Sequence, residues 1–125
     1  VRDIRLNMHY EKVGRWMRLN IPAGERIYHA NGSDASYFLC LNPKNEYIVF
    51  CDPIYMYYRY PDMYRTYIDL RHGRVGRPAE ALKGVFKARY GYTLKSNPLY
   101  GQVAGGPGNF KILFEDDMGI IFEVV

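Results

Sequence analysis

Three arginines and one histidine lie within seven residues in the segment RHGRVGR, which directly precedes Pro78. They are Arg71, His72, Arg74 and Arg77, and two glycines interrupt them. Guanidinium groups match the geometry of phosphate oxygens, and the N–H groups at the start of a following helix also favour an anion. The segment therefore predicts a phosphate-binding site, although it has neither P-loop nor dinucleotide-loop spacing. A solvated basic loop is the alternative interpretation.

Six tyrosines fall within thirteen residues in the neighbouring segment YMYYRYPDMYRTY, residues 55–67. Aromatic rings beside arginines are typical of surfaces on which the bases of single-stranded nucleic acids stack. Tyr58 and Tyr60, together with Arg59 and Arg65, are the candidates for such contacts. Two alternatives are open: the rings pack in the core with their hydroxyl groups hydrogen-bonded, or they form an interface between subunits, where tyrosine and arginine are enriched.

The three histidines, His9, His29 and His72, are far apart, and no HxH, HExxH or CxxC spacing occurs. The sequence therefore predicts no metal site and no cofactor. A ribonuclease-like site would need two histidines, or a histidine and a glutamate, near an arginine. His9 and His29 on the polar faces of neighbouring strands, with Arg5 or Arg71 nearby, would meet that requirement. No residue is assigned a catalytic role on this basis.

Length and composition describe a single soluble domain that spans residues 1–125. With 48% hydrophobic and 24% charged residues, the chain is large enough to bury one core. No apolar run approaches the roughly 20 residues that a membrane span needs, so we expect no membrane insertion. Polar groups at every second place of the first residues argue against a secretory signal. The net charge of +4 favours anionic partners such as nucleic acid.

Alternating apolar and polar residues predict strands along most of the chain. A further segment, residues 61–73, is either a helix that begins at Pro61 and ends at Gly73 or a strand, and its Tyr, Thr and Ile residues favour the strand. A helix is expected at about 78–90, with Pro78 in its first turn and Gly91 after its end. The fold class is α+β: a β-rich antiparallel sheet or meander of about seven to nine strands with one packed α-helix. The strands are expected at 3–10, 15–21, 26–30, 35–41, 46–51, 54–60, 92–94, 110–115 and 120–125.

The two cysteines, Cys40 and Cys51, would lie on adjacent strands joined by the turn at residues 42–45. An offset of four residues would separate them by about 13 Å along the strands. A disulfide needs Cα atoms within about 7 Å. We therefore expect two free thiols, mostly buried.

Small polar residues are scarce: three serines, two threonines and one glutamine stand against thirteen tyrosines and eleven arginines. In this composition, and in the passage YMYYRYPDMYRTYIDLRHGR, the chain resembles small orphan proteins of viruses that infect hyperthermophilic archaea. The scarcity of glutamine beside many charged side chains favours a thermophilic source, whereas five methionines and seven asparagines favour the opposite. The resemblance implies a location in the host cytoplasm or in the virion and no assignable enzyme function. From the residues themselves we expect a non-enzymatic protein that binds the phosphate backbone of nucleic acid. A homo-oligomer built through the aromatic strand is the alternative, and a ribonuclease-like enzyme is the third.

Overall fold

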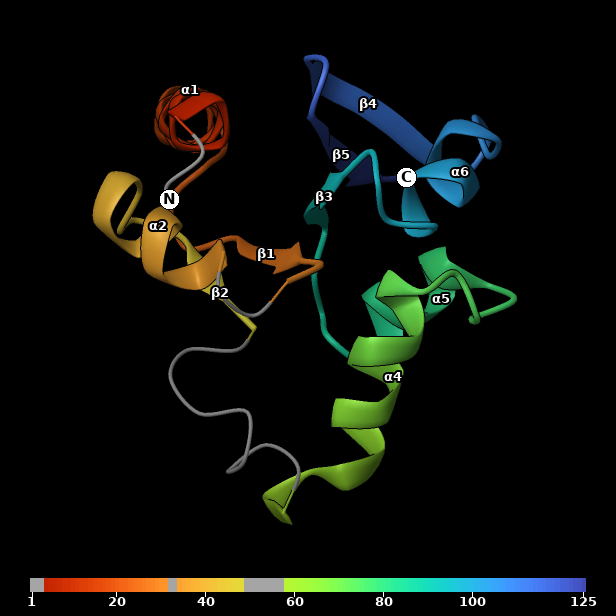
Figure 1. Cartoon of the computed structure of the whole chain (residues 1–125). Helices are drawn as coiled ribbons and strands as arrows, with labels where there is room; N and C mark the ends of the chain where they lie inside the picture. Colours follow the sequence, from red (N-terminus) through yellow and green to blue (C-terminus); the bar gives the residue numbers. More distant parts are fainter. Residues whose placement is uncertain (1–3, 32–33, 49–57) are drawn as a thin grey trace.

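The computed structural model describes residues 4–31, 34–48 and 58–125, and their helices and strands form three layers (Figure 1). The strands are β1 (Arg26–His29), β2 (Glu46–Tyr47), β3 (Tyr90–Leu94), β4 (Phe110–Glu115) and β5 (Gly119–Val124). They form one sheet in the order β2-β1-β3-β5-β4. β1 is parallel to β2 and β3, whereas β5 is antiparallel to β3 and β4. The sheet is therefore mixed, and it forms the middle layer (Figure 1).

Two helices, α1 (Ile4–Asn20) and α2 (Asp34–Leu41), cover one face of the sheet (Figure 1). They pack closely because α1 carries Gly14 at the contact, where a Cβ would lie only 2.6 Å from the Cβ of Leu41. The apolar side chains buried on this face include Tyr10, Val13, Met17, Ile27, Phe38, Tyr92 and Ile121.

Three helices cover the opposite face: α4 (Pro61–Arg71), α5 (Pro78–Gly84) and α6 (Leu99–Ala104) (Figure 1). Tyrosines also form part of this core. The hydroxyl of Tyr28 donates to the carbonyl oxygen of Tyr67 at 3.1 Å. The hydroxyl of Tyr67 donates in turn to the carbonyl oxygen of His29 at 2.6 Å. The ring of Tyr67 is therefore core, as one of the alternatives for the tyrosine-rich segment predicted. The same cluster buries Leu70, Leu82, Phe86, Leu99, Val103 and Phe122.

The expected meander at the N-terminus is wrong, because residues 4–20 form one continuous helix. The apolar residues at every second position suggested a strand, but Ile4 and Met8 are 71% and 63% exposed. The buried positions of α1 recur instead at helical spacing, three to four residues apart. They are His9, Tyr10, Val13, Gly14 and Met17.

The strand expected at 35–41 is also wrong, and α2 occupies that segment. α2 connects β1 to β2, and two parallel strands need such a crossover rather than the tight turns expected at residues 31–32 and 42–45. Cys40 is free and exposed on α2, so its expected burial is wrong as well. Cys51 and residues 54–57 of the expected aromatic strand lie outside the described residues.

The segment 61–73 is a helix, so the preference for a strand there is wrong and the alternative is confirmed. Pro61 lies at the start of α4, and Gly73 follows its end with a φ of 71°. The expected helix at 78–90 begins at Pro78 but ends at Gly84, and Gly91 belongs to β3. α6 is a further helix that the sequence did not indicate. The strand that begins at Arg26 and the final hairpin of β4 and β5 are confirmed.

Candidate nucleic-acid interface

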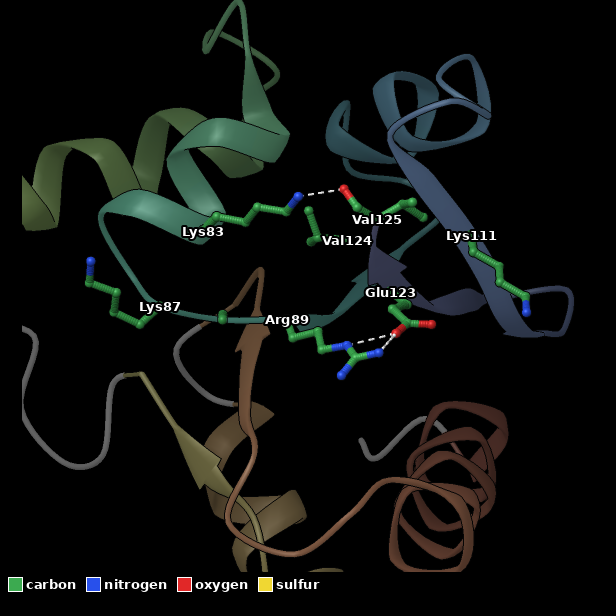
Figure 2. A pocket seen from close by; sticks show the side chains of 8 residues that line it. Lys83, Lys87, Arg89, Lys111, Glu123, Val124 and Val125 are labelled. Carbon is green, nitrogen blue, oxygen red and sulfur yellow. Dashed lines mark hydrogen bonds and ion pairs between the residues drawn. The ribbon is translucent and has the colours of Figure 1, made fainter.

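Four cationic side chains from separate parts of the chain line a hollow of about 670 Å³, called here the basic hollow (Figure 2). They are Lys83 of α5, Lys87 and Arg89 of the connection to β3, and Lys111 of β4, and all four are exposed. Glu123 of β5 is the one acidic side chain among the described residues that line it. Four cationic side chains therefore face one acidic side chain.

Two of the four cations have partners inside the basic hollow. The Nε and Nη2 atoms of Arg89 lie 2.7 and 2.6 Å from Oε2 of Glu123, and the hydrogen bond raises the pKa of the arginine further above its ordinary value. Lys83 donates to the main-chain oxygen of Val125 at 2.5 Å. Figure 2 shows Lys87 and Lys111 on opposite sides of the Arg89–Glu123 pair. The positive charge is therefore spread across the hollow rather than gathered around one point.

Buried and exposed residues alternate along the segment between α5 and β3, and its cations take the exposed positions. Phe86 and Ala88 are each 1% exposed, whereas Lys87 and Arg89 on either side of Ala88 are exposed. The N–H of Ala88 donates to the carbonyl oxygen of Leu82, which closes the end of α5. Lys87 has a φ of 56° at this point, a left-handed conformation that glycine adopts without steric cost. The cost for a residue with a Cβ is about 1–2 kcal/mol, and the fold holds a lysine there nonetheless.

The predicted arginine segment does not form a single cluster of unpaired charges. Arg71 at the end of α4 is half-buried and donates to Oδ1 of Asn31 at 3.3 Å. Its Nη2 also lies 3.3 Å from Nε2 of the exposed His72. The charge of Arg71 is close enough to Asp34 to act against the rise in the pKa of that buried carboxyl. Arg71 is therefore placed to link α4 to the residues that follow β1.

The other two arginines of the segment are exposed and lie beside carboxylates. Nη1 of Arg74 is 3.4 Å from Asp69, and Nη1 of Arg77 is 3.5 Å from Glu80. Exposed pairs of this kind contribute little to stability and leave the guanidinium accessible. Arg77 lines a hollow of about 430 Å³ beside Asn109 and Phe110. Since the next residue, Lys111, lines the basic hollow, Arg77 lies close to its border.

The predicted aromatic residues lie at the other end of α4. Tyr58 and Tyr60 are 78% and 43% exposed, and the guanidinium of Arg59 lies 5.3 Å from the ring centroid of Tyr60. Arg65 is exposed on α4 itself. The eleven residues of α4 put about 16 Å between these rings and Arg71. The structure therefore keeps the aromatic and the arginine candidates apart.

A chain of buried polar side chains crosses the layer between α1 and the sheet. His9 places Nδ1 2.6 Å from Oδ2 of Asp116 and Nε2 2.5 Å from the hydroxyl of Tyr92. Tyr92 is hydrogen-bonded to Tyr10, whose hydroxyl donates to Oδ1 of Asp34. Burial alone would raise the pKa of Asp116, but hydrogen bonds from His9 and two backbone N–H groups outweigh it and lower that pKa. These hydrogen-bonded side chains join α1, β3, the β4–β5 turn and the start of α2.

The two histidines considered for a ribonuclease-like site are both buried. His9 is 3% exposed and His29 is 0% exposed. Burial lowers the pKa of His29 to about 4, so the ring is neutral at pH 7, and its Nδ1 lies 2.9 Å from the carbonyl oxygen of Asn31. Burial raises the pKa of Asp34 to about 6 against the effect of its hydrogen bond from Tyr10. These groups have partners in the interior, and His9 with its partner Asp116 also lines a hollow of about 350 Å³.

Sequence reasoning missed the basic hollow because its cations come from two distant parts of the chain. Lys83, Lys87 and Arg89 fall within the helix expected at about 78–90, and Lys111 stands alone in a strand. The one available signal was the net charge of +4, which indicates an anionic partner but not where it binds.

The comparisons with known proteins assign no family. No protein-family model matches the chain, and no match to a curated protein was found. Among the described residues, no helix is both long and apolar enough to cross a membrane, and no group of three or more metal-ligating side chains is present.

Proposed function

We propose that the protein binds the phosphate backbone of a nucleic acid through the basic hollow. The observation that carries the proposal is the set of four exposed cations, Lys83, Lys87, Arg89 and Lys111, around the single carboxylate of Glu123. Phosphate contacts made by lysine and arginine release counterions from the nucleic acid, and this release supplies most of the sequence-independent affinity.

The distribution of the charges favours a chain of phosphates over one phosphate group. Lys87 and Lys111 lie on opposite sides of the Arg89–Glu123 pair (Figure 2), so a single small anion would leave part of the charge unused. The opposite end of the β4–β5 hairpin offers no such excess. There, Arg5 and Lys12 line a hollow together with two carboxylates, those of Asp116 and Asp117.

The test is binding of a fluorescent oligonucleotide at ~50 and ~200 mM salt, measured by anisotropy. With Arg89 held by Glu123, three phosphate contacts predict that affinity falls roughly 20- to 40-fold between these salt concentrations. The double variant Lys87→Gly, Lys111→Ala should reduce the salt slope by about two. Lys87→Gly relieves the left-handed backbone at this position, so the fold should tolerate it.

The matched control is the double variant Arg5→Ala, Lys12→Ala, which removes the same number of charges beside the β4–β5 turn. It should leave the salt slope nearly unchanged. No binding by the native protein at ~50 mM salt would reject the proposal. Equal losses in the two double variants would reject the basic hollow as the contact surface.

Self-association is a second proposal, since Tyr58 and Tyr60 are 78% and 43% exposed. Tyrosine and arginine side chains are enriched at interfaces between subunits, and Arg59 stands between the two tyrosines in the sequence. Light scattering over a range of protein concentrations tests it. A monomer at the highest concentration would exclude it.

A further inference from the structure

An aromatic and apolar hollow of about 370 Å³ adjoins the basic hollow. Its apolar lining includes Tyr60, Met63, Val85 and Phe86, and we call it the aromatic hollow. Val85 and Phe86 line the aromatic hollow, while the next two residues along the chain, 87 and 88, line the basic hollow. One short segment therefore borders both hollows.

Tyr60 is the exposed aromatic residue of the aromatic hollow. It is 43% exposed, and Arg59 lies 5.3 Å from its centroid. Tyr60 stands at the N-cap of α4 but makes no side-chain capping hydrogen bond. The ring is therefore not needed to begin the helix, and a half-exposed ring beside an arginine has the chemistry of a stacking platform for a planar base.

The aromatic hollow also has a polar side with an oriented donor and an acceptor. Nη1 of Arg26 donates to the carbonyl oxygen of Phe86 at 2.7 Å, which fixes the guanidinium against the segment between the hollows. Its Nε and Nη2 atoms lie 3.4 and 3.3 Å from the carboxylate of Glu46. These distances are long for hydrogen bonds, and both side chains are exposed. Arginine donors and a carboxylate acceptor are the groups that proteins use to hydrogen-bond the edges of bases.

We propose that the nucleic acid is single-stranded, with one base in the aromatic hollow, stacked on Tyr60, and the adjoining phosphates in the basic hollow. The inference rests on the proposed function and adds the strandedness of the ligand. In a duplex the bases are stacked and paired inside the helix, whereas the bases of a single strand are free to stack on an aromatic side chain. The volume of the aromatic hollow lies within the range of pockets that hold small planar ligands.

Four probes separate the contributions of the two hollows. They are a single-stranded DNA oligonucleotide, the RNA of the same sequence, the corresponding DNA duplex, and heparin, a polyanion without bases. Affinities are measured at ~50 mM salt for the native protein, Tyr60→Ala, Tyr60→Phe and Lys87→Gly. Circular dichroism and unfolding midpoints establish that each variant is folded.

Tyr60→Ala should weaken single-strand binding roughly 5- to 150-fold, the range that one stacked base supplies. It should leave the duplex and heparin affinities unchanged. Tyr60→Phe keeps the ring and should bind as the native protein does, whereas Lys87→Gly should weaken all four probes. A difference between the DNA and RNA strands identifies which of the two is preferred.

Two outcomes overturn the inference in distinguishable ways. If single strand and duplex bind equally and Tyr60→Ala has no effect, the ligand is not held by a base and the inference fails. If Lys87→Gly still weakens binding in that case, the proposed phosphate contacts stand. If none of the nucleic-acid probes binds at ~50 mM salt, the proposed function fails and the inference fails with it.

Discussion

Nδ1 of His9 lies 2.6 Å from Oδ2 of Asp116, although the two residues are 107 positions apart in the chain. The side chain of His9 is 1% exposed and that of Asp116 is 10% exposed, so little solvent screens the contact. The other ring nitrogen of His9 contacts the hydroxyl of Tyr92. This pair therefore attaches the first helix to the turn of the last hairpin through a buried, charge-assisted hydrogen bond, which is among the stronger polar contacts in proteins.

His9→Ala should lower the free energy of unfolding by about 2–4 kcal/mol, since it leaves both the Asp116 carboxylate and the Tyr92 hydroxyl without their partner. Urea unfolding at pH 7 measures the change. Lys12→Ala is the control, because Nζ of Lys12 lies 3.7 Å from the same carboxylate oxygen but its side chain is 59% exposed. That variant should cost no more than about 0.5–1 kcal/mol. Similar losses in both variants would contradict the buried contact.

Asp34 and His29 should give the stability two pH dependences of opposite sign. Between about pH 4 and 6 the unfolded chain ionises Asp34 while the folded chain keeps it protonated, so this contribution to the free energy of unfolding falls as the pH rises. Between about pH 4 and 6.5 the unfolded chain protonates His29 while the folded chain holds it neutral, so this contribution rises with pH. The two nearly cancel in the native protein.

Single variants should reveal each component. Asp34→Asn removes the contribution that falls with pH, so the free energy of unfolding of this variant should rise from about pH 4 to 6.5. His29→Gln removes the contribution that rises with pH, so the free energy of unfolding of that variant should fall from about pH 4 to 6. Each slope amounts to roughly 3 kcal/mol across the window, because a pKa difference of one is worth about 1.4 kcal/mol. Urea unfolding at intervals of half a pH unit measures the slopes. Two variants with the slope of the native protein would show that neither group titrates differently on folding.

Gly91→Ala should destabilise the sheet by about 1–3 kcal/mol through overpacking. A Cβ at Gly91 would lie 2.3 Å from the ring of Phe122, its partner across β3 and β5. Gly84→Ala is the matched control: a Cβ there has nothing within 4 Å, and alanine favours a helix, so that variant should be neutral or up to about 1 kcal/mol more stable. The added change Phe122→Leu should cost less in Gly91→Ala than in the native protein. Strict additivity would contradict the proposed clash.

The N-terminal elements could not be predicted because buried polar residues resemble surface residues in a sequence. His9 and Asp34 are 3% and 0% exposed, yet each belongs to a type that is normally outside. Ile4 and Met8 produce the opposite error, since they are apolar but lie largely in solvent. Only the tertiary partners, such as Asp116 for His9, distinguish these cases, and a sequence does not show them.

The C-terminal elements were predictable because their signals are local. β4 and β5 are apolar runs separated by the short turn around Asp116, and their antiparallel pairing follows from that short connection. The basic hollow could not be predicted, because its residues are far apart in the sequence. The arginines at 71–77 lie within seven residues and were noticed, whereas Lys83 and Lys111 are brought to one hollow only by the packing of α5 beside the sheet.

Glu123→Gln should strengthen nucleic-acid binding, because it removes the carboxylate from the basic hollow and releases the guanidinium of Arg89. The affinity should rise at low salt and the salt slope should steepen by about one. The fold should lose no more than about 1 kcal/mol, since the side chain of Arg89 is 60% exposed. Anisotropy titrations between ~50 and ~200 mM salt measure the affinity and the salt slope.

Glu11→Gln is the control for Glu123→Gln. Glu11 also pairs with an exposed arginine, Arg15, at 2.7 Å, but it lies on α1 and away from the basic hollow. Both variants raise the net charge equally, so a general effect of charge would strengthen binding by the same factor in each. A gain confined to Glu123→Gln assigns the contact to the basic hollow, because only there does the lost carboxylate lie among the cations proposed to bind phosphate. An equal gain, or none in Glu123→Gln, would place the nucleic acid elsewhere on the protein.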